Sequence, residues 1–413
     1  MKSRRILISA YGCEPGKGSE QGVGWNWCLQ LGSLAELVVI TRSNNQSSVE
    51  AALPPSLAER IRFEFYDLPP AIRRLKRKEK GLYFYYLLWQ WGAYRRAKEL
   101  AKRSRFDYAM HLTFGSIWMP TFMHRLSLPF IWGPVGGGEA VPFMLIGALP
   151  LSGRVTQYLR YGLMATLPIN PLLMGIVRRS RIILARTEDT AKLIPARHAS
   201  KVHVVLETGV ADDLLSGSIC EHVGNAGPLR VIYTGRLVAL KNVAVGIHAI
   251  ARARARGANL ELVIVGNGPL REVLKALAER LGIAEFVSFL GSIPQASVME
   301  QLAMSDVYLF PSLKEGGVWS LMEAMSVGLP AVCVNTSGMA VITDETSAIR
   351  VAPDSQERMI AGFTQALVDL AQSPELRLRL GTNARKRIEE HFRWHHKAEF
   401  IQALFDELEQ PAR

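Results

Sequence analysis

Runs of apolar and β-branched residues recur along the chain at strand length, and each is followed by a mixed segment long enough to contain a helix. This alternation predicts parallel α/β sheets, because parallel strands need long crossover connections. The predicted strands of a first series are RILISA, LVVIT, RFEFY, DYAMHLT, PFIWGPV, RIILAR and VHVVLE. Those of a second series are LRVIYTG, LELVIVG, VSFLG, DVYLFPS, PAVCVNT and AIRVA.

Between the two series lies the polar stretch DDLLSGSICEHVGNAGP, which is typical of an interdomain linker. A chain of 413 residues is also too long for one ordinary core. We therefore predict a Rossmann-like N-terminal domain over 1–212, a linker over 213–228 and a Rossmann-like C-terminal domain over 229–390. Doubly wound parallel sheets bind ligands beyond the carboxyl ends of their strands, so a central cleft between facing lobes is the expected active site.

Composition places the chain among globular proteins, with 48% hydrophobic and 21% charged residues. Its four cysteines are Cys13, Cys28, Cys220 and Cys333. They are too scattered for a CxxC metal site or a disulfide framework, which predicts a reducing, cytoplasmic location. The apolar run near the N-terminus is too short for a signal peptide. The apolar stretch 81–93 is too short to span a membrane, and 161–177 is interrupted by prolines, so we expect no transmembrane helix.

The net charge of +12 is concentrated in the first half of the chain. Residues 1–212 carry 29 Lys and Arg against 15 Asp and Glu, or +14, whereas residues 213–413 carry 20 against 22, or −2. No nucleic-acid-binding module is recognisable, so no nucleic-acid partner is predicted. Six cations precede the aromatic run 83–91: Arg73, Arg74, Lys76, Arg77, Lys78 and Lys80. This arrangement favours binding to an anionic membrane surface. The alternative is a solvated basic helix over a buried aromatic stripe.

A pair of cations follows the first predicted strand of the second domain. Gly235 and Arg236 stand at the strand end, and Lys241 comes five positions after Arg236, before a helix. A guanidinium, an ammonium and free backbone N–H groups at a helix start make a site for a diphosphate, although both side chains can instead be ordinary surface charges. The glycines of the next loop, Gly266 and Gly268, predict a tight structural turn rather than a dinucleotide fingerprint.

Two carboxylates stand eight positions apart in KEGGVWSLMEAM. With a helix beginning near Val318, Glu315 lies in the preceding loop and Glu323 lies about one and a half turns inside. Carboxylates accept hydrogen bonds from paired hydroxyls, which suits a sugar ring at Glu315 and a ribose at Glu323, while Gly316 and Gly317 let backbone N–H groups approach a ligand. The alternative is that both carboxylates are only helix charges.

The motifs GRLVALK, LVIVGNGPLR, VSFLGSIPQASV and PSLKEGGVWSLMEAMSVGLPAV, in this order, resemble the retaining glycosyltransferases of family 4, which have the GT-B fold. The resemblance covers nearly the whole second domain. It implies that Arg236 and Lys241 bind the donor diphosphate, Glu315 the transferred sugar and Glu323 the nucleotide ribose. No metal or other cofactor is expected, because the two cations neutralise the leaving group. It also implies that the C-terminal helix within 391–413 crosses back to the first lobe.

The loop GCEPGKGSE after the first strand lacks the spacing of a Walker A loop. By the resemblance, KGSE matches a GGxE-like pattern except that Lys17 replaces the first glycine. The resemblance implies that Gly18 approaches the donor diphosphate, that Lys17 meets a phosphate or the acceptor, and that Glu20 lies on the acceptor side or caps the helix. His111, which we place just after the fourth strand, matches a histidine beside the donor sugar, although a lone histidine there is often structural.

The loop WGPVGGGEAVP is the last candidate, with Gly137 and Glu139 expected on the acceptor side because its glycines let a ligand approach the backbone. The resemblance implies a glycosyltransferase that moves a sugar from a nucleotide sugar to a hydroxyl of a lipid-linked or glycan acceptor, with retention of configuration. Glu315 and His111 are the catalytic candidates. The alternatives are a GT-B nucleotide-sugar epimerase, which needs no acceptor, and a non-catalytic protein that binds a lipid surface. A cytoplasmic enzyme peripheral to the inner face of the membrane is expected.

Overall fold

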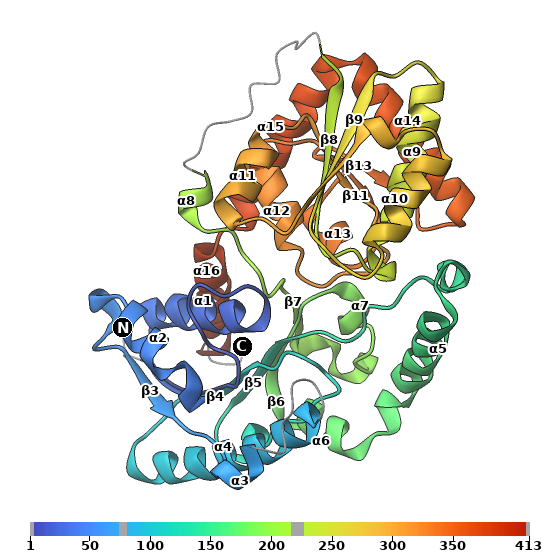
Figure 1. The fold of residues 1–413 in the computed structure, drawn as a ribbon. Coiled ribbons are helices and arrows are strands. Elements are labelled where there is room, and N and C mark those ends of the chain that lie inside the picture. The colour runs from blue at the N-terminus through green and yellow to red at the C-terminus, as the bar shows by residue number, and fades with distance from the viewer. Residues whose placement is uncertain (1–3, 74–80, 216–226, 410–413) are drawn as a thin grey trace. The chain divides into compact units, whose positions relative to one another are not determined.

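The computed structural model describes residues 4–73, 81–215 and 227–409 (Figure 1). The chain forms two compact units, each made from segments that are separate in the sequence. The first unit comprises Met1–Gly138, Leu163–Glu207 and Trp394–Arg413, and the second comprises Glu139–Gly162 and Thr208–Arg393. The predicted linker begins inside a short helix, and most of it lies outside the described residues.

The first unit contains a seven-stranded parallel sheet in the order β3-β2-β1-β4-β5-β6-β7. Its strands correspond to the runs of the first predicted series, which are thereby confirmed. They are β1 (Arg4–Ala10), β2 (Ala35–Thr41), β3 (Ile61–Phe65), β4 (Tyr108–Thr113), β5 (Phe130–Val135), β6 (Ser180–Ala185) and β7 (Val202–Val204). The helices of this unit are α1 (Ser19–Leu34), α2 (Gln46–Ala52), α3 (Pro70–Arg73), α4 (Leu82–Arg103), α6 (Pro171–Arg179), α7 (Glu188–Ala191) and α16 (His395–Glu409).

The second unit contains a six-stranded parallel sheet in the order β10-β9-β8-β11-β12-β13, and it confirms the second predicted series. Its strands are β8 (Leu229–Thr234), β9 (Leu260–Val265), β10 (Val287–Gly291), β11 (Val307–Phe310), β12 (Ala331–Val334) and β13 (Ala348–Val351). Its helices are α8 (Asp212–Leu215), α9 (Val243–Ala255), α10 (Arg271–Arg280), α11 (Gln295–Ala303), α12 (Trp319–Ser326), α13 (Ser337–Ile342), α14 (Gln356–Gln372) and α15 (Pro374–His391). Helix α5 (Leu151–Thr166) begins in this unit and ends in the first.

The C-terminal helix α16 completes the core of the first unit. Phe405 is fully buried, with its ring 4.8 Å from that of Tyr108 on β4. Arg4 at the start of β1 donates hydrogen bonds to Glu409 at 2.7 Å and to Asp406 at 3.1 Å. The sheet of this unit is therefore covered by a helix from the far end of the chain.

The aromatic run at the start of α4 is divided between the core and the surface. Tyr85, Tyr86 and Trp89 are buried in the core of the first unit, whereas Tyr83 and Phe84 are exposed. Of the six cations that precede this run, only Arg73 falls among the described residues. No helix in the described part of the chain is long and apolar enough to cross a membrane.

Each sheet reverses its strand order at one place, between β1 and β4 in the first unit and between β8 and β11 in the second. At such a reversal the loops after two neighbouring strands diverge to opposite sides, which opens a crevice at the carboxyl ends. The loops after β8 and β11 carry the predicted donor-binding residues Arg236, Lys241, Glu315, Gly316 and Gly317. The strand order, which the sequence did not reveal, thus brings these two loops to one edge of the sheet.

Candidate functional site

The loop after β8 carries the two predicted donor cations. Arg236 is exposed and follows Gly235, the first residue after the strand. Lys241 ends the short 3-10 helix η7 (Ala239–Lys241), directly before α9. Both cations thus lie between the carboxyl end of a parallel strand and the start of a helix, as the sequence predicted.

Lys241 and Glu315 form an ion pair that joins the loops after β8 and β11. The distance from Nζ to Oε1 is 2.6 Å, and each side chain is 17% exposed. The Ser312 hydroxyl donates to the same carboxylate oxygen at 2.5 Å, and the Lys241 ammonium also lies 5.1 Å from the centroid of the Phe310 ring. The structure therefore brings together a cation predicted for the diphosphate and a carboxylate predicted for the sugar.

The loop that carries Glu315 packs against the start of α13. The backbone N–H of Gly338 donates to the carbonyl oxygen of Glu315 at 3.0 Å. A Cβ atom added to Gly338 would lie 1.7 Å from the carbonyl oxygen of Gly316, so only glycine fits at this position. Glycine at 338 thus sets the position of Glu315, Gly316 and Gly317.

Glu323 lies on α12, which begins at Trp319, one residue after the predicted start. Its carboxylate accepts a hydrogen bond from Nε2 of Gln295 on α11 at 2.8 Å. Burial raises the pKa of Glu323, and the bond from Gln295 offsets part of this rise. The positions of Glu315 in the loop and Glu323 inside the helix are confirmed.

The fully buried Tyr308 on β11 connects the two carboxylates electrostatically. Its hydroxyl lies 3.0 Å from the Thr234 hydroxyl at the end of β8. Burial raises the pKa of Tyr308, hydrogen bonds to its hydroxyl oppose this rise, and the negative charges of Glu323 and Glu315 add to it. Glu315 and Glu323 both follow the carboxyl end of β11, the first in the loop and the second on α12.

Gly266 and Gly268 pack the loop after β9 against the loop after β8. A Cβ atom at Gly266 would lie 2.0 Å from the carbonyl oxygen of Gly235, and one at Gly268 would lie 2.4 Å from that of Leu237. The two loops also share a hydrogen bond from the Leu237 N–H to the Asn267 carbonyl at 2.9 Å. These glycines have the structural role that was predicted for them.

In the first unit, Gly18 is the N-cap residue of α1 and Lys17 lies in the exposed loop before it, with Nζ 3.9 Å from a Glu14 oxygen. The Glu20 carboxylate accepts a hydrogen bond from the Gly115 N–H in the loop after β4, at 3.2 Å. Burial raises the pKa of Glu20, and the Gly115 bond opposes this rise. Glu20 therefore joins the two loops at the strand-order reversal instead of capping its own helix.

His111 lies within β4 and not after it, which corrects the sequence interpretation. The apolar run continues through His111 to Thr113, so the strand extends past the histidine. The imidazole is fully buried, and its Nε2 lies 3.4 Å from the hydroxyl of the buried Tyr86. Burial lowers the pKa of His111 to about 4, while a backbone hydrogen bond at Phe114 offsets part of this. The ring is therefore neutral near pH 7.

Gly137 and Glu139 follow β5 on either side of the boundary between the compact units. Gly137 has a φ of 128°, and its carbonyl oxygen accepts a hydrogen bond from the Trp118 indole at 3.1 Å. Glu139 is fully buried, and its backbone carbonyl accepts a bond from the Arg160 guanidinium at 2.7 Å. The role of this loop toward an acceptor stays a prediction.

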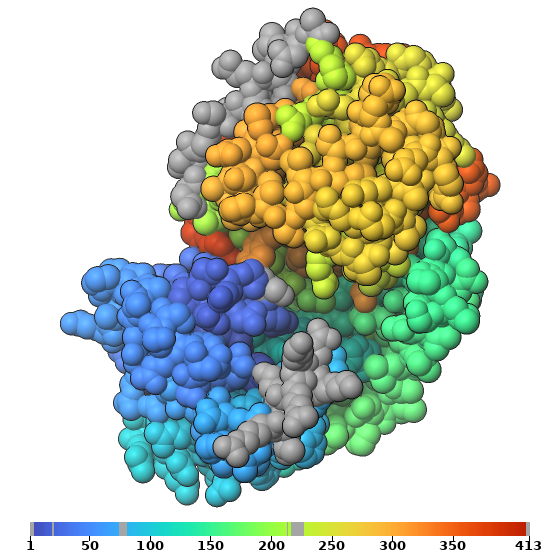
Figure 2. Space-filling model, in the orientation of Figure 1, coloured from blue at the N-terminus to red at the C-terminus, as the bar shows by residue number. Residues whose placement is uncertain are grey.

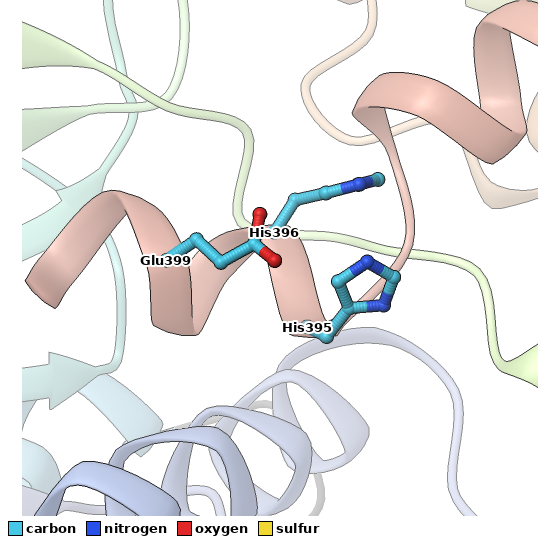
Figure 3. Close-up of side chains that lie close together, drawn as sticks. All are labelled: His395, His396 and Glu399. Carbon is cyan, nitrogen blue, oxygen red and sulfur yellow. The ribbon is translucent and has the colours of Figure 1, made fainter.

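One group of side chains can supply metal ligands. His395, His396 and Glu399 lie in the first turns of α16, and Figure 3 shows the Glu399 carboxylate directed toward the same space as the two imidazoles. Their ligand atoms lie within 4.8 Å of one another, and Glu399 is exposed. None of the three belongs to the donor residues, so the expectation of metal-independent chemistry stays a prediction.

The two parallel-sheet Rossmann-like lobes define the class of fold as GT-B. The lipopolysaccharide outer core galactosyltransferase WaaB is similar in fold, with a TM-score of 0.63 and 15% identity over 98% of this chain and 99% of WaaB. The Anabaena protein HepE in complex with UDP has a TM-score of 0.63 and 13% identity over 98% of this chain and 100% of HepE. At these identities the similarity establishes the fold alone.

Sequence comparison identifies the second unit more closely. Residues 221–387 match the family model of the glycosyl transferases group 1, and this segment contains Arg236, Lys241, Glu315 and Glu323. The amylovoran biosynthesis glycosyltransferase AmsK of Erwinia amylovora is 30% identical over 174 residues, which are 41% of this chain and 42% of AmsK. The putative colanic acid biosynthesis glycosyltransferase WcaL of Escherichia coli K12 is 31% identical over 142 residues, which are 33% of this chain and 35% of WcaL. The chain thus spans less than half the length of these relatives, and the match supports a group 1 glycosyltransferase domain in the second unit.

Proposed function

We propose that the protein is a retaining glycosyltransferase that moves a sugar from a nucleotide-sugar donor to a hydroxyl group of a glycan or lipid-linked acceptor. The contact between Lys241 and Glu315 carries this proposal, because it joins a phosphate-binding type of group to a sugar-binding type of group within the matched segment. A related structure supports a nucleotide sugar as the donor, since the Anabaena protein HepE forms a complex with UDP and glucose.

Each donor residue is assigned to a different part of the nucleotide sugar. Arg236 and Lys241 bind the diphosphate, to which an ammonium and a guanidinium each donate charge-assisted hydrogen bonds. Glu315 accepts hydrogen bonds from hydroxyls of the transferred sugar, and the backbone N–H groups of Gly316 and Gly317 donate to oxygen atoms of the same ligand. Glu323 accepts from the ribose hydroxyls, and its bond from Gln295 fixes the carboxylate in place.

In the proposed reaction, the bond between the anomeric carbon and the diphosphate oxygen breaks, and both electrons leave with the diphosphate. The acceptor oxygen forms its bond to the same carbon from the same face, which retains the configuration. A phosphate oxygen of the leaving group takes the acceptor proton. Arg236 and Lys241 stabilise the negative charge that develops on the diphosphate, so the step needs no metal ion. We further propose that His111, which is fully buried within β4, stabilises the sugar or its developing positive charge through a backbone or ring contact.

We assign acceptor binding to Lys17, Glu20 and Gly137 of the first unit and to the neighbouring Glu139, and we keep Gly18 as a residue whose backbone approaches the donor diphosphate. AmsK is named for the biosynthesis of amylovoran, WcaL for that of colanic acid, and WaaB for the lipopolysaccharide outer core. These names support a polysaccharide or lipid-linked precursor as the acceptor. The basic stretch from Arg73 to Lys80 is proposed to bring the enzyme to the inner face of the membrane, where such a precursor is carried. Residues 74–80 of this stretch lie outside the described residues.

Titration calorimetry with nucleoside diphosphates tests the donor site directly. A charge-assisted hydrogen bond is worth about 1.5–3 kcal/mol, so Arg236→Ala and Lys241→Ala should each weaken binding by about tenfold or more. The exposed Arg256 at the end of α9 offers a matched control, and Arg256→Ala should bind like the wild type.

A screen of nucleotide sugars by thermal shift then identifies the donor, because a ligand at 100 times its dissociation constant stabilises the folded state by about 2.7 kcal/mol. Incubation of that donor without acceptor separates transfer from epimerisation, since an epimerase releases an altered nucleotide sugar with no acceptor present. Binding that is equal in the wild type, Arg236→Ala and Lys241→Ala would remove the basis of the proposal.

A further inference from the structure

Helix α5 has the reverse of the side-chain distribution expected for a surface helix. Of its residues, only Gln157 is buried, and Gln157 is polar. The amide oxygen of Gln157 accepts a hydrogen bond from the Val141 N–H at 3.4 Å. The Arg154 guanidinium donates to the carbonyl oxygens of Leu149 at 2.8 Å and Gly147 at 2.6 Å. The polar side chains of α5 therefore hold it against the segment that precedes it.

The apolar side chains of α5 lie on the surface. Leu151, Val155, Tyr158 and Leu159 are each at least half exposed, and their spacing of four, three and one positions places them on one face of the helix. Phe143 and Met144 in the preceding 3-10 helix η4 (Phe143–Ala148) are also more than half exposed. The Phe143 ring lies 5.9 Å from the Tyr158 ring, so the two segments are continuous. We call these six residues the α5 apolar face.

Scattered exposed apolar residues need no explanation, but a continuous group of six large ones does. The side chains beneath the face are well packed, since Leu145, Ile146 and Leu149 are buried. The exposure is therefore a property of an ordered segment, with its core residues inside and a second set of apolar residues outside. In Figure 2 the atoms of this segment, in the teal-green part of the colour scale, lie on the surface.

The charge of the surrounding sequence indicates what covers this face. From Ala140 to Thr187 the chain has no Asp or Glu, and it has six arginines. Both charged residues of α5 itself, Arg154 and Arg160, are arginines. An apolar helix face whose own helix carries two arginines and no acidic residue complements an anionic lipid bilayer, in which the apolar side chains enter the boundary of the acyl chains and the cations face the headgroups.

We propose that the α5 apolar face docks on an anionic lipid bilayer, with α5 parallel to the membrane plane. With 16 residues, α5 is about 24 Å long, and it contains two arginines, so it lies on the bilayer and does not cross it. The α5 apolar face shares no residue with the basic stretch that ends at Lys80. The inference concerns membrane binding and does not depend on the proposed transferase activity.

A second copy of the chain is a poorer partner for this face. A twofold-symmetric contact places the same surface of each copy against the other, which would bring Arg154 and Arg160 toward the arginines of the partner. No acidic residue between Ala140 and Thr187 is available to compensate their charge. An anionic bilayer has no such conflict.

The test is flotation of the full chain with phosphatidylcholine vesicles that contain phosphatidylglycerol, compared with vesicles of phosphatidylcholine alone. We expect binding to the anionic vesicles and much weaker binding to the neutral ones. The triple variant Leu151→Gln, Val155→Gln and Leu159→Gln should lose at least tenfold in vesicle affinity, or about 1.4 kcal/mol. Its thermal midpoint should stay near that of the wild type, because the three side chains are exposed already.

A matched control replaces apolar residues that are equally exposed elsewhere, with Val273→Gln on α10 and Leu378→Gln on α15. This control should bind vesicles as the wild type does. The proposal is overturned if the wild type binds neither kind of vesicle, if it binds both equally, or if the triple variant and the control lose affinity alike. It is also overturned if the triple variant only converts a dimer to a monomer in sedimentation, which would assign the face to a second copy. Calorimetry with nucleoside diphosphates is unaffected by any of these outcomes, so the donor site is tested separately.

Discussion

At the scale of single residues, the contact between Lys241 and Glu315 couples the two halves of the proposed donor site. Each group is mostly buried and has the other as its counter-ion. A diphosphate that binds Lys241 must compete with Glu315, and this competition frees the carboxylate for the hydroxyls of the sugar. Binding of the diphosphate and recognition of the sugar are therefore expected to depend on each other.

The first prediction is that Glu315→Gln separates binding from turnover. The amide keeps the shape of the side chain but loses the charge that accepts hydrogen bonds from sugar hydroxyls, so kcat should fall at least tenfold. Because the variant also releases Lys241 from its ion pair, affinity for a nucleoside diphosphate should stay the same or rise. Steady-state kinetics and calorimetry on the same preparation measure both quantities.

Glu323→Gln is the matched comparison, because Glu323 is assigned to the ribose, which the donor and the free nucleotide share. This variant should weaken both ligands by about tenfold. If Glu315→Gln and Glu323→Gln proved kinetically alike, the assigned division of roles would be wrong.

The second prediction concerns the pH dependence of stability. The pKa of His111 is about 4 in the folded protein, against a reference value of 6.5. Between these values the unfolded chain binds more protons than the folded one, so the stability contributed by this neutral histidine is complete above pH 6.5 and is lost as the pH falls toward 4. The difference corresponds to about 3 kcal/mol.

Urea unfolding of the wild type and His111→Gln between pH 4 and 7 measures this effect. The variant has no imidazole to protonate, so its stability should change less over this interval, even if it is lower throughout. Parallel curves for the two proteins would show that protonation of His111 does not contribute.

At the scale of elements, the loops at the strand ends depend on close contacts with neighbouring elements. The 315–317 loop lies against the start of α13, where Gly338 leaves no room for a side chain. The loop after β8 is packed against the loop after β9 in the same way, at Gly266 and Gly268. The positions of the donor residues therefore depend on packing against neighbouring segments. The local sequence of each loop fixes only part of its conformation.

The third prediction is that Gly338→Ala displaces the 315–317 loop and so weakens nucleotide binding at the donor site. The new Cβ would lie 1.7 Å from a backbone oxygen, so the loop has to move, at an expected cost of about 1–3 kcal/mol in stability and a clear loss of nucleotide affinity. Gly175→Ala on α6 is the control, because a Cβ there meets nothing within 4 Å. That variant should be neutral or more stable by up to about 1 kcal/mol. Chemical denaturation and calorimetry distinguish the two, and wild-type behaviour of Gly338→Ala would contradict the packing argument.

At the scale of the whole molecule, each of the two units has its own sheet and core, and the proposed donor side chains of Arg236, Lys241, Glu315 and Glu323 belong to the second unit. The first unit is completed by α16, a helix from the opposite end of the chain. Binding of a nucleotide is therefore expected to stabilise one part of the protein more than the other.

The fourth prediction is that a nucleoside diphosphate protects backbone amides of residues 235–242 and 313–323 from hydrogen exchange, since a ligand that bridges two loops opposes their local opening. The double variant Arg236→Ala and Lys241→Ala should show no protection under the same conditions. Protection confined to the loops of the first unit would place the nucleotide elsewhere.

The sequence was sufficient to predict the strands, the two Rossmann-like sheets, and the places of Glu315 and Glu323 relative to α12. These features depend on local pattern: a run of β-branched residues forms a strand wherever it is buried, and a helix start follows from a glycine pair before a helix-forming run. His111 was placed wrongly after the strand, although the predicted run DYAMHLT contains it and continues to Thr113.

Three contributors to the site gave no signal at all: Ser312, Gln295 and Gly338. Each acts through a contact made only in the folded chain: Gln295 and Gly338 meet residues distant in sequence, and Ser312 meets Glu315 within a loop whose path the tertiary structure sets. The α5 apolar face was also missed, because an apolar helix in the sequence is ordinarily read as a buried one.

By itself, the sequence determined which segments form strands and helices, because that choice depends on periodicity, turn residues and helix starts within a few positions of one another. Only the tertiary structure decided the strand order that joins the loops after β8 and β11, the pairing of Lys241 with Glu315, and the outward direction of the apolar residues of α5. The physical reason is that these three features depend on which segments, distant in sequence, pack together and exclude water. The order of apolar and polar residues along the chain does not contain that information.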